Sequence, residues 1–502
     1  MTNLVLRNAR ILGDERPVDV SIVGGAIAGV GAGIDVAMAS EELDLGGRWL
    51  MPGLWDAHVH FTQWARFRGR IDVSGSTSAA DAVARLVSGA AAGPWDGDVV
   101  IGRGYQDALW ADAQGSSAQG SSAQGADAMT SQTLDVAFPG RAVVIVSHDL
   151  HSVWLNDAAA VRFGARSGGV LREAEAFAVE IALDAAASPA EDDVALRAAV
   201  AEASARGVVG IRDLEMADNP AVWASRIAHG LDALRVEACI YPDHLAASDA
   251  RGLRGGDVVH GTRGLITVGG LKVFSDGSLN TLTALTHEPY GRAGGEHSVG
   301  HAAHSPEGLR ELLAAAHGRG LEVALHAIGD AAVTHALDAF EATRARGTIE
   351  HAQLVAERDL PRFAELGIAA SVQPQHAIDD RDVTDAIWAD RAARAFPYRS
   401  LAEAGARLLM GSDAPVAPLD PWGTIAAAVH RSGDDRESWH SEQELSRDAA
   451  IAASVRGAVV VGEQADLVAV DLDPLRATAQ QLRAMPVALT MVGGRITHRS
   501  GI

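Results

Sequence analysis

Over most of the chain, short apolar runs alternate with longer alanine-rich stretches. Short β-branched runs predict buried strands, and the alanine-rich stretches between them predict helices, so the pattern indicates α/β structure. Eight such runs can be counted, the number that a closed parallel barrel needs, although the count depends on where their boundaries are drawn. The predicted strands are Met51–Val59, Val208–Asp213, Arg235–Tyr241, Leu265–Phe274, Leu321–His326, Thr348–His351, Ile368–Val372 and Arg407–Met410.

Both ends of the chain have a different texture, with short strand-like runs and glycine-rich turns. Leu4–Leu6 and Val18–Val23 lie near the start, and Ala465–Val470 and Leu489–Ile496 lie near the end. Two β-rich ends around an α/β middle predict that the termini meet in one small composite domain. We therefore expect an α/β fold: a (β/α)₈ TIM-like barrel with this composite domain.

A long segment between the first and second predicted barrel strands is too long for a simple crossover. It contains the strand-like runs Val99–Gly102 and Ala142–Ser147, which predict an inserted α+β lobe. Within it, Ala113–Ser117 repeats at Ala118–Ser122, and this low-complexity tract is expected to be a flexible surface loop. The expected domains are residues 1–50 and 458–502 for the composite domain, 51–70 and 196–457 for the barrel, and 71–195 for the lobe.

Composition narrows the class of protein. The chain has 502 residues, 48% of them hydrophobic, and a net charge of −23 without an arginine-rich run, so nucleic acid is not expected as a partner. The sequence contains no run of about 18 apolar residues, so a membrane span is not expected. The start lacks the pattern of a signal peptide, and the single cysteine, Cys239, excludes an intrachain disulfide. We expect a cytoplasmic protein with a small-molecule substrate, and a homo-oligomer is left open.

Lys272 is the only lysine in the chain, and the other 41 of the 42 lysine and arginine residues are arginine. It lies in the run Gly-Gly-Leu-Lys-Val-Phe-Ser-Asp-Gly, at the end of a predicted strand. A buried lysine can lose its proton and act as a nucleophile, whereas a guanidinium group stays charged. Coding bias could also leave one lysine by chance, so the functional interpretation depends on what surrounds it.

Candidate metal ligands stand where the predicted strands end. His58 and His60 point to the same face of one strand, because side chains alternate along a strand. His326, His351 and Asp413 end or closely follow three later strands. The carboxyl ends of barrel strands meet at one face, so these five residues and Lys272 are expected to converge. A single histidine at a strand end is more often a packing residue than a ligand. The full ordered set is much stronger evidence for a metal site.

This ordered set resembles the amidohydrolase superfamily, together with Met51-Pro52-Gly53 and Gly462–Leu467. Further motifs resemble the branch that contains N-substituted formamide deformylases. They are Ser147–Ser152 with Asn156, Gly169–Glu173, Lys272–Gly277, His326–Asp330, Ile349–Ala352, Gln373–His376 and Gly411–Pro415. The likeness covers nearly the whole chain, apart from the repeat near residue 113 and a shortened alanine-rich segment at residues 445–462.

The resemblance implies a (β/α)₈ barrel in which the composite domain is a β-sandwich. It also implies a binuclear metal site, usually zinc, with manganese, cobalt or iron left open. Lys272 would carry a CO₂-derived carbamate that bridges both ions. One ion would be held by His58, His60 and Asp413, and the other by His326 and His351. A hydroxide bridging the metals would attack the substrate carbonyl, and Asp413 would be the catalytic acid and base.

Substrate contacts are predicted less sharply. Asp149 and His151 of the lobe could cap the barrel mouth, and Gln373 and His376 end the seventh predicted strand. Trp64 and Trp110 either line an apolar pocket or belong to the core, and Arg172 and Glu173 are expected to form internal ion pairs.

The function that the resemblance implies is hydrolysis of a non-peptide C–N bond in a small linear amide, an N-formyl or N-acyl derivative of an apolar amine. The alternatives are a heterocycle deaminase or cyclic-amide hydrolase of the same superfamily, or a relative that binds ligands without catalysis.

Overall fold

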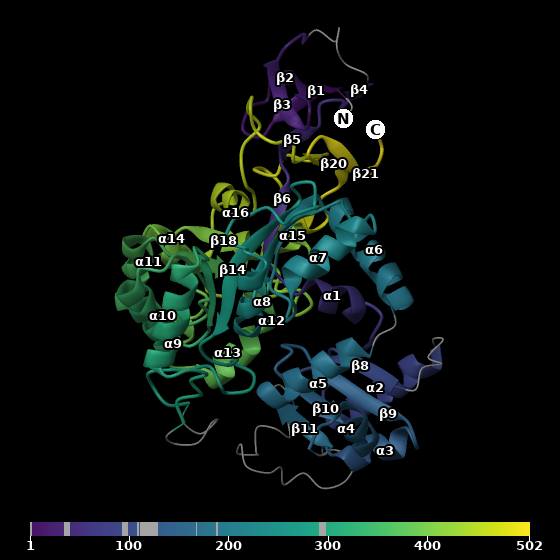
Figure 1. The fold of residues 1–502 in the computed structure, drawn as a ribbon, viewed down its shortest axis with the longest axis vertical. Coiled ribbons are helices and arrows are strands. Elements are labelled where there is room, and N and C mark those ends of the chain that lie inside the picture. The colour runs from purple at the N-terminus through teal and green to yellow at the C-terminus, as the bar shows by residue number, and fades with distance from the viewer. Residues whose placement is uncertain are drawn as a thin grey trace.

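The computed structural model describes residues 3–34, 41–92, 99–107, 110, 129–166, 168–186, 189–290 and 298–502. The repeat that begins at Ala113 lies outside the described residues. Figure 1 shows three parts: a barrel in the middle, a sheet that holds both chain ends above it, and a lobe below it.

The barrel contains all eight predicted strands, in sequence order and parallel. Several are buried along their whole length, so apolar residues occupy both faces of a strand instead of alternating, as in Val208–Ile211 and Val323–Leu325. The strands are β6 (Leu54–Val59), β12 (Val208–Asp213), β13 (Arg235–Ile240), β14 (Ile266–Phe274), β15 (Val323–Ala327), β16 (Gly347–His351), β17 (Ala369–Val372) and β18 (Leu408–Met410).

The barrel is nearly closed where β18 approaches β6. These two strands share no continuous ladder, but the backbone N–H of Asp413 donates to His58 O at 2.8 Å, and that of His60 donates to Ala414 O at 2.8 Å. The (β/α)₈ prediction is therefore confirmed, and the closure itself joins the first and last of the predicted site residues.

Helices surround the strands and bury their apolar faces against them. Caps set their starts: Ser305 accepts from the N–H of Gly308 at α9, and Asp218 accepts from the N–H of Ala221 at α7. None of the described helices is long and apolar enough to cross a membrane. The helices around the barrel are α1 (Phe61–Phe67), α6 (Pro189–Ala205), α7 (Asn219–Ala228), α8 (Leu245–Ala250), α9 (Pro306–Gly318), α10 (Asp330–Thr343), α11 (Leu360–Leu366), α12 (His376–Asp379), α13 (Arg381–Ile387), α14 (Tyr398–Glu403), α15 (Pro421–Val429), α16 (Arg447–Ala453) and α17 (Ala479–Arg483).

The termini meet in one mixed sheet, which confirms that the two ends form a composite unit. The joint is the antiparallel pairing of β5 with β19, in which Leu467 lies opposite Pro52. The glycine-rich stretch after Val23 turns at Gly24 and Gly25, both at positive φ, and then forms a strand of its own. The strands are β1 (Leu4–Ile11), β2 (Pro17–Val23), β3 (Ala26–Gly31), β4 (Glu41–Asp44), β5 (Trp49–Pro52), β19 (Leu467–Val470), β20 (Val487–Val492) and β21 (Arg495–Arg499).

The inserted lobe has its own five-stranded sheet and its own apolar core. Both predicted strands of the lobe are present, as β8 and β9. The strands are β7 (Ile71–Asp72), β8 (Val99–Tyr105), β9 (Ala142–Ser147), β10 (Ser152–Leu155) and β11 (Gly169–Arg172), and the helices are α2 (Ala79–Ala92), α3 (Ser131–Ala137), α4 (Asp157–Phe163) and α5 (Ala174–Ala185). The lobe follows β6 and α1 in the chain. It therefore stands near the carboxyl end of β6, at the face where the other parallel strands of the barrel also end.

Candidate metal centre

A pocket of about 770 Å³, part of it open solvent, lies where the barrel meets the lobe. It is lined by all six residues predicted from the strand ends: His58, His60, Lys272, His326, His351 and Asp413. These residues come from five strands or the segments directly after them, because parallel strands of a barrel end at one face.

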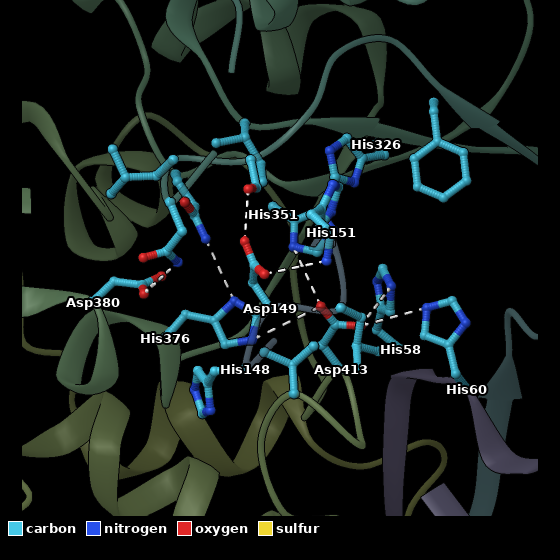
Figure 2. A pocket seen from close by; sticks show the side chains of 18 of the residues that line it. His58, His60, His148, Asp149, His151, His326, His351, His376, Asp380 and Asp413 are labelled. Atoms are coloured by element: carbon cyan, nitrogen blue, oxygen red, sulfur yellow. Dashed lines mark hydrogen bonds and ion pairs between the residues drawn. The ribbon is translucent and has the colours of Figure 1, made fainter. Parts of the chain in front are cut away.

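Asp413 lies at the centre of four imidazole rings (Figure 2). Its Oδ1 is 3.3 Å from His58 Nε2 and 3.5 Å from His60 Nε2, and its Oδ2 is 3.9 Å from His351 Nδ1 and 3.8 Å from His376 Nε2. Ligand atoms of His58, His60 and Asp413 lie within 4.8 Å of one another, and so do those of His351, His376 and Asp413. Two buried groups that share one carboxylate are consistent with a binuclear metal site.

The ring nitrogens that face Asp413 fit metal ions better than they fit a protein-only core. His58 Nε2, His351 Nδ1 and His376 Nε2 are buried and have no hydrogen-bond partner among the described residues. An unsatisfied buried polar atom costs about 1–3 kcal/mol, so such a cluster needs another explanation. Burial lowers the pKa of His60 to about 3 and that of His58 well below its ordinary value, which keeps the rings neutral, the form that binds metals.

The segment that carries Asp413 is held against β6 by backbone hydrogen bonds. The carboxylate of Asp56 accepts from the backbone N–H groups of Ser412 at 2.9 Å and His58 at 3.1 Å. A Cβ at Gly411 would lie 2.6 Å from the backbone N of His58, so only glycine allows this approach. The Gly-Ser-Asp order of the motif therefore follows from packing.

The backbone at two of these residues lies in the left-handed region. Asp413 has φ +59° and His351 has φ +72°, a conformation that non-glycine residues adopt at a cost of about 1–3 kcal/mol. Such strain persists only where the surrounding structure imposes it, and it aims both side chains into the pocket. Strand periodicity carries no signal for this feature.

Glu350 orients His58 from behind. The Nδ1–H of His58 donates to Glu350 Oε2 at 2.7 Å, which leaves Nε2 to face Asp413. Glu350 is fully buried and lies 3.5 Å from Arg212, a buried guanidinium that also approaches Glu322 at 3.5 Å. The charged partner therefore compensates a carboxylate that burial alone would disfavour.

Glu350→Gln is expected to weaken metal binding by about 10–100-fold, the usual effect of removing a group that orders a ligand. The amide cannot accept from Nδ1–H with the same charge, and Arg212 loses a counter-charge. Competition with a chelator would measure the affinity. Glu322→Gln is the matched control, because it removes a half-exposed partner of the same arginine. Equal metal affinity in Glu350→Gln and the native protein would refute this role.

Lys272 is 1% exposed and lines the pocket, with Nζ 4.9 Å from the centre of the Phe274 ring. Burial lowers the pKa of its amine, and the carboxylates of Glu350 and Asp413 oppose the shift. The lowered pKa favours the neutral amine, the form that can act as a nucleophile.

His326 and His376 are placed differently from the other candidates. His326 belongs to neither of the two compact groups, although its ring centre is 4.5 Å from that of His351. Its Nε2–H donates to Gly277 O at 3.1 Å. His376, predicted as a substrate contact, belongs to the second group. It begins the short helix α12 instead of ending a strand, so the strand-end pattern could not select it as a ligand.

The remaining predicted contacts lie at different depths. Asp149 and His151 line the pocket; Gln373 does not, and its amide lies 3.4 Å from His58 Nδ1. Burial would lower the pKa of His151, but Glu173, whose carboxylate is 2.9 Å from Nδ1, outweighs it and raises the pKa to about 9. Arg172 pairs with Asp107 at 3.2 Å. Arg172 and Glu173 therefore both form internal ion pairs, as predicted.

The two tryptophans belong to the core. Trp64 and Trp110 are 4% and 5% exposed, neither lines the pocket, and the indole N–H of Trp110 donates to Ser76 O. The apolar walls are instead made by residues that the sequence analysis did not assign to a pocket: Leu150, Phe177, Met216, Phe274, Leu279, Ile328 and Val416.

Residues 41–498 match the sequence profile of the amidohydrolase family, and the chain belongs to that family. The putative amidohydrolase YtcJ of Bacillus subtilis is 26% identical over 91% of this chain and 90% of its own. The N-substituted formamide deformylase of Arthrobacter pascens is 24% identical over 99% of this chain and 98% of its own. Among solved structures, an uncharacterized metal-dependent hydrolase from Pyrococcus horikoshii has a TM-score of 0.76 at 24% identity and covers 95% of this chain and 99% of its own, which shows the fold. Family and site together define a metal-dependent hydrolase of the amidohydrolase superfamily.

Proposed function

We propose that this protein hydrolyses a small linear amide, an N-formyl or small N-acyl amine, with two divalent metal ions in the pocket. The observation that carries the proposal is the convergence on Asp413 of the imidazole nitrogens of His58 and His351, which have no hydrogen-bond partner among the described residues. The similarity to an N-substituted formamide deformylase over nearly the full length supports the choice of a linear amide.

In this proposal His58, His60 and Asp413 would hold one ion and His326 and His351 would hold the other, and Lys272 would carry a CO₂-derived carbamate that supplies further ligand oxygens. Bound divalent ions, zinc by preference, would polarise the substrate carbonyl and lower the pKa of water toward neutrality. The buried amine of Lys272 is suited to capture CO₂, because burial lowers its pKa and so favours the neutral, nucleophilic form.

Asp413 moves the proton in the proposed reaction. Burial raises the pKa of its carboxyl to about 7, with Lys272 and His151 opposing the shift. A group with a pKa near the working pH can both accept and return a proton. Asp413 takes the proton from the attacking water and delivers it to the nitrogen as the C–N bond breaks, so that acid and amine are released.

Metal counting tests the site. We expect elemental analysis after metal supplementation to find two divalent ions per chain. His326→Ala should lose one ion, whereas His376→Ala should keep both, because His376 is proposed to contact the substrate. Loss of an ion in His376→Ala alone would transfer the ligand role to that residue, and fewer than one ion per native chain would refute the centre.

A substrate panel tests the reaction. Metal-loaded protein should hydrolyse formamides and acetamides of simple amines and should release little ammonia from amino-heterocycles. Cyclic amides belong in the same panel, because their turnover would distinguish a cyclic-amide hydrolase from a hydrolase of linear amides. Ammonia release from a heterocycle, without turnover of any linear amide, would replace the amide hydrolase with a deaminase.

A further inference from the structure

Glu180 faces the pocket from the inserted lobe. It lies on α5 three residues after Phe177, and residues at this spacing share one helix face. Both side chains line the pocket. Glu180 is 1% exposed, and none of the described residues forms a hydrogen bond with its Oε1. A buried carboxyl oxygen without a hydrogen-bond partner therefore stands in the wall of the pocket.

The charged residues near Glu180 are engaged elsewhere. The guanidinium of Arg70 pairs with Asp184, one turn further along α5, at 3.7 Å. The carboxylate of Glu215 accepts from the backbone N–H groups of Gln63 and Met216. Burial raises the pKa of Glu180 to about 8, with Arg70 opposing the shift and Asp184 adding to it. An unsatisfied buried carboxyl is costly, so its retention in a pocket indicates a partner that enters with the ligand.

The charge of the other walls indicates which kind of partner fits. Beyond the metal-binding groups, the described lining contains the carboxylates of Asp149, Asp379 and Asp380 and contains no arginine. Lys272 lies at the metal end, His151 is paired with Glu173, and His148 lies 3.9 Å from Asp379. An anionic substrate group would face carboxylates here, whereas an ammonium group would be attracted.

We propose that Glu180 is a specificity-determining residue that binds a protonated amino group at the far end of the substrate's amine half. The acyl end would lie at Asp413, and the intervening methylene groups would pack on Phe177 and Phe274, whose ring centres are 5.9 Å apart. The inference rests on the proposed function and changes its substrate from the amide of an apolar amine to the monoamide of a diamine.

Two amides of equal length test the assignment. N-formylcadaverine ends in an ammonium group, and N-formylhexylamine ends in a methyl group at the same position. Glu180→Gln should lower kcat/KM for the ammonium substrate about ten- to hundredfold, the scale of one hydrogen bond to a charged group, mainly through KM. Its kcat/KM for the hexylamide should stay unchanged. Glu175→Gln, an exposed residue of the same helix that pairs with Arg166, should change neither.

Two further measurements separate the possible failures. Glu180→Asp keeps the charge and should recover part of the ammonium preference, and thermal unfolding with metal content should be matched among all variants. An equal loss for both amides in Glu180→Gln would mean a structural role and overturn the assignment. Turnover of both amides without a preference for ammonium in the native protein would also overturn it.

Calorimetric binding of cadaverine and hexylamine to metal-loaded protein needs no turnover. We expect cadaverine to bind more tightly, and Glu180→Gln to remove the difference. If this holds while no linear amide is hydrolysed, the proposed reaction fails and the role of Glu180 stands. If hydrolysis occurs and the two amines bind equally to native protein, the role of Glu180 fails and the reaction stands.

Discussion

Lys272→Arg is expected to abolish amide hydrolysis, with a loss on the order of a thousandfold or more, the scale of losing a main electrostatic element of an active site. The guanidinium group stays charged and cannot capture CO₂, so the proposed bridge between the two ions cannot form. Lys272 is buried within β14, so the variant must be shown to fold, by circular dichroism and thermal unfolding, before its rate is interpreted. Near-normal turnover in Lys272→Arg would refute the carbamate.

Two companion variants separate loss of the bridge from loss of packing. Lys272→Ala leaves space beside Phe274, and added formate, acetate or propionate should restore part of the activity by occupying the position of the carbamate. Lys272→Met fills a similar volume with an apolar chain, so it should be inactive and should not respond to carboxylates. Rescue of both variants, or of neither, would count against a bridging carboxylate at this position.

Asp413→Asn is expected to lower kcat by about 10²- to 10⁴-fold, the usual contribution of general acid–base catalysis. The amide keeps the shape of the side chain but can neither accept the proton from water nor return it to the leaving nitrogen. Because Asp413 lies in both metal-binding groups, metal content must be measured in the same preparation. The rate is expected to fall by more than the metal occupancy does.

The control for Asp413→Asn is Asp338→Asn, an exposed residue of α10 that pairs with Arg362. It undergoes the same chemical change far from the pocket and should retain native rate and metal content. Full metal occupancy with an undiminished rate in Asp413→Asn would remove this residue from the proton transfer. A parallel loss of metal and rate would limit its role to that of a ligand.

The barrel could be predicted because buried parallel strands leave a simple signal. Runs such as Val208–Ile211 and Val323–Leu325 are apolar without alternation, since both faces of these strands are covered, and the alanine-rich helices between the strands are separately recognisable. The short hairpin strand Ala26–Gly31 lies in a glycine-rich stretch, and its glycines partly conceal the period of a strand. The chain ends could be paired in principle, but their register follows from contacts between Pro52 and Leu467 that no local pattern specifies.

The candidate site was predictable only as far as it follows strand ends. His58, His60, His351 and Asp413 converge as expected, since the carboxyl ends of barrel strands share one face. His376 lies on a helix after its strand. Glu180 comes from the inserted lobe, and no sequence pattern specifies how that lobe packs against the barrel. Their approach to the pocket is a consequence of how the lobe and the loops pack.

By itself the sequence determined the class of fold, the order of the ligand-bearing strands and the singular place of Lys272, because these depend on local periodicity and residue chemistry. The tertiary structure decided which nitrogen of each imidazole faces Asp413, how Glu350 and Arg212 support His58, and which carboxyl remains unpartnered in the pocket wall. Those features arise from burial and from contacts between residues hundreds of positions apart. Such contacts set the desolvation and the nearby charges that control each pKa, and neither can be read from a local pattern.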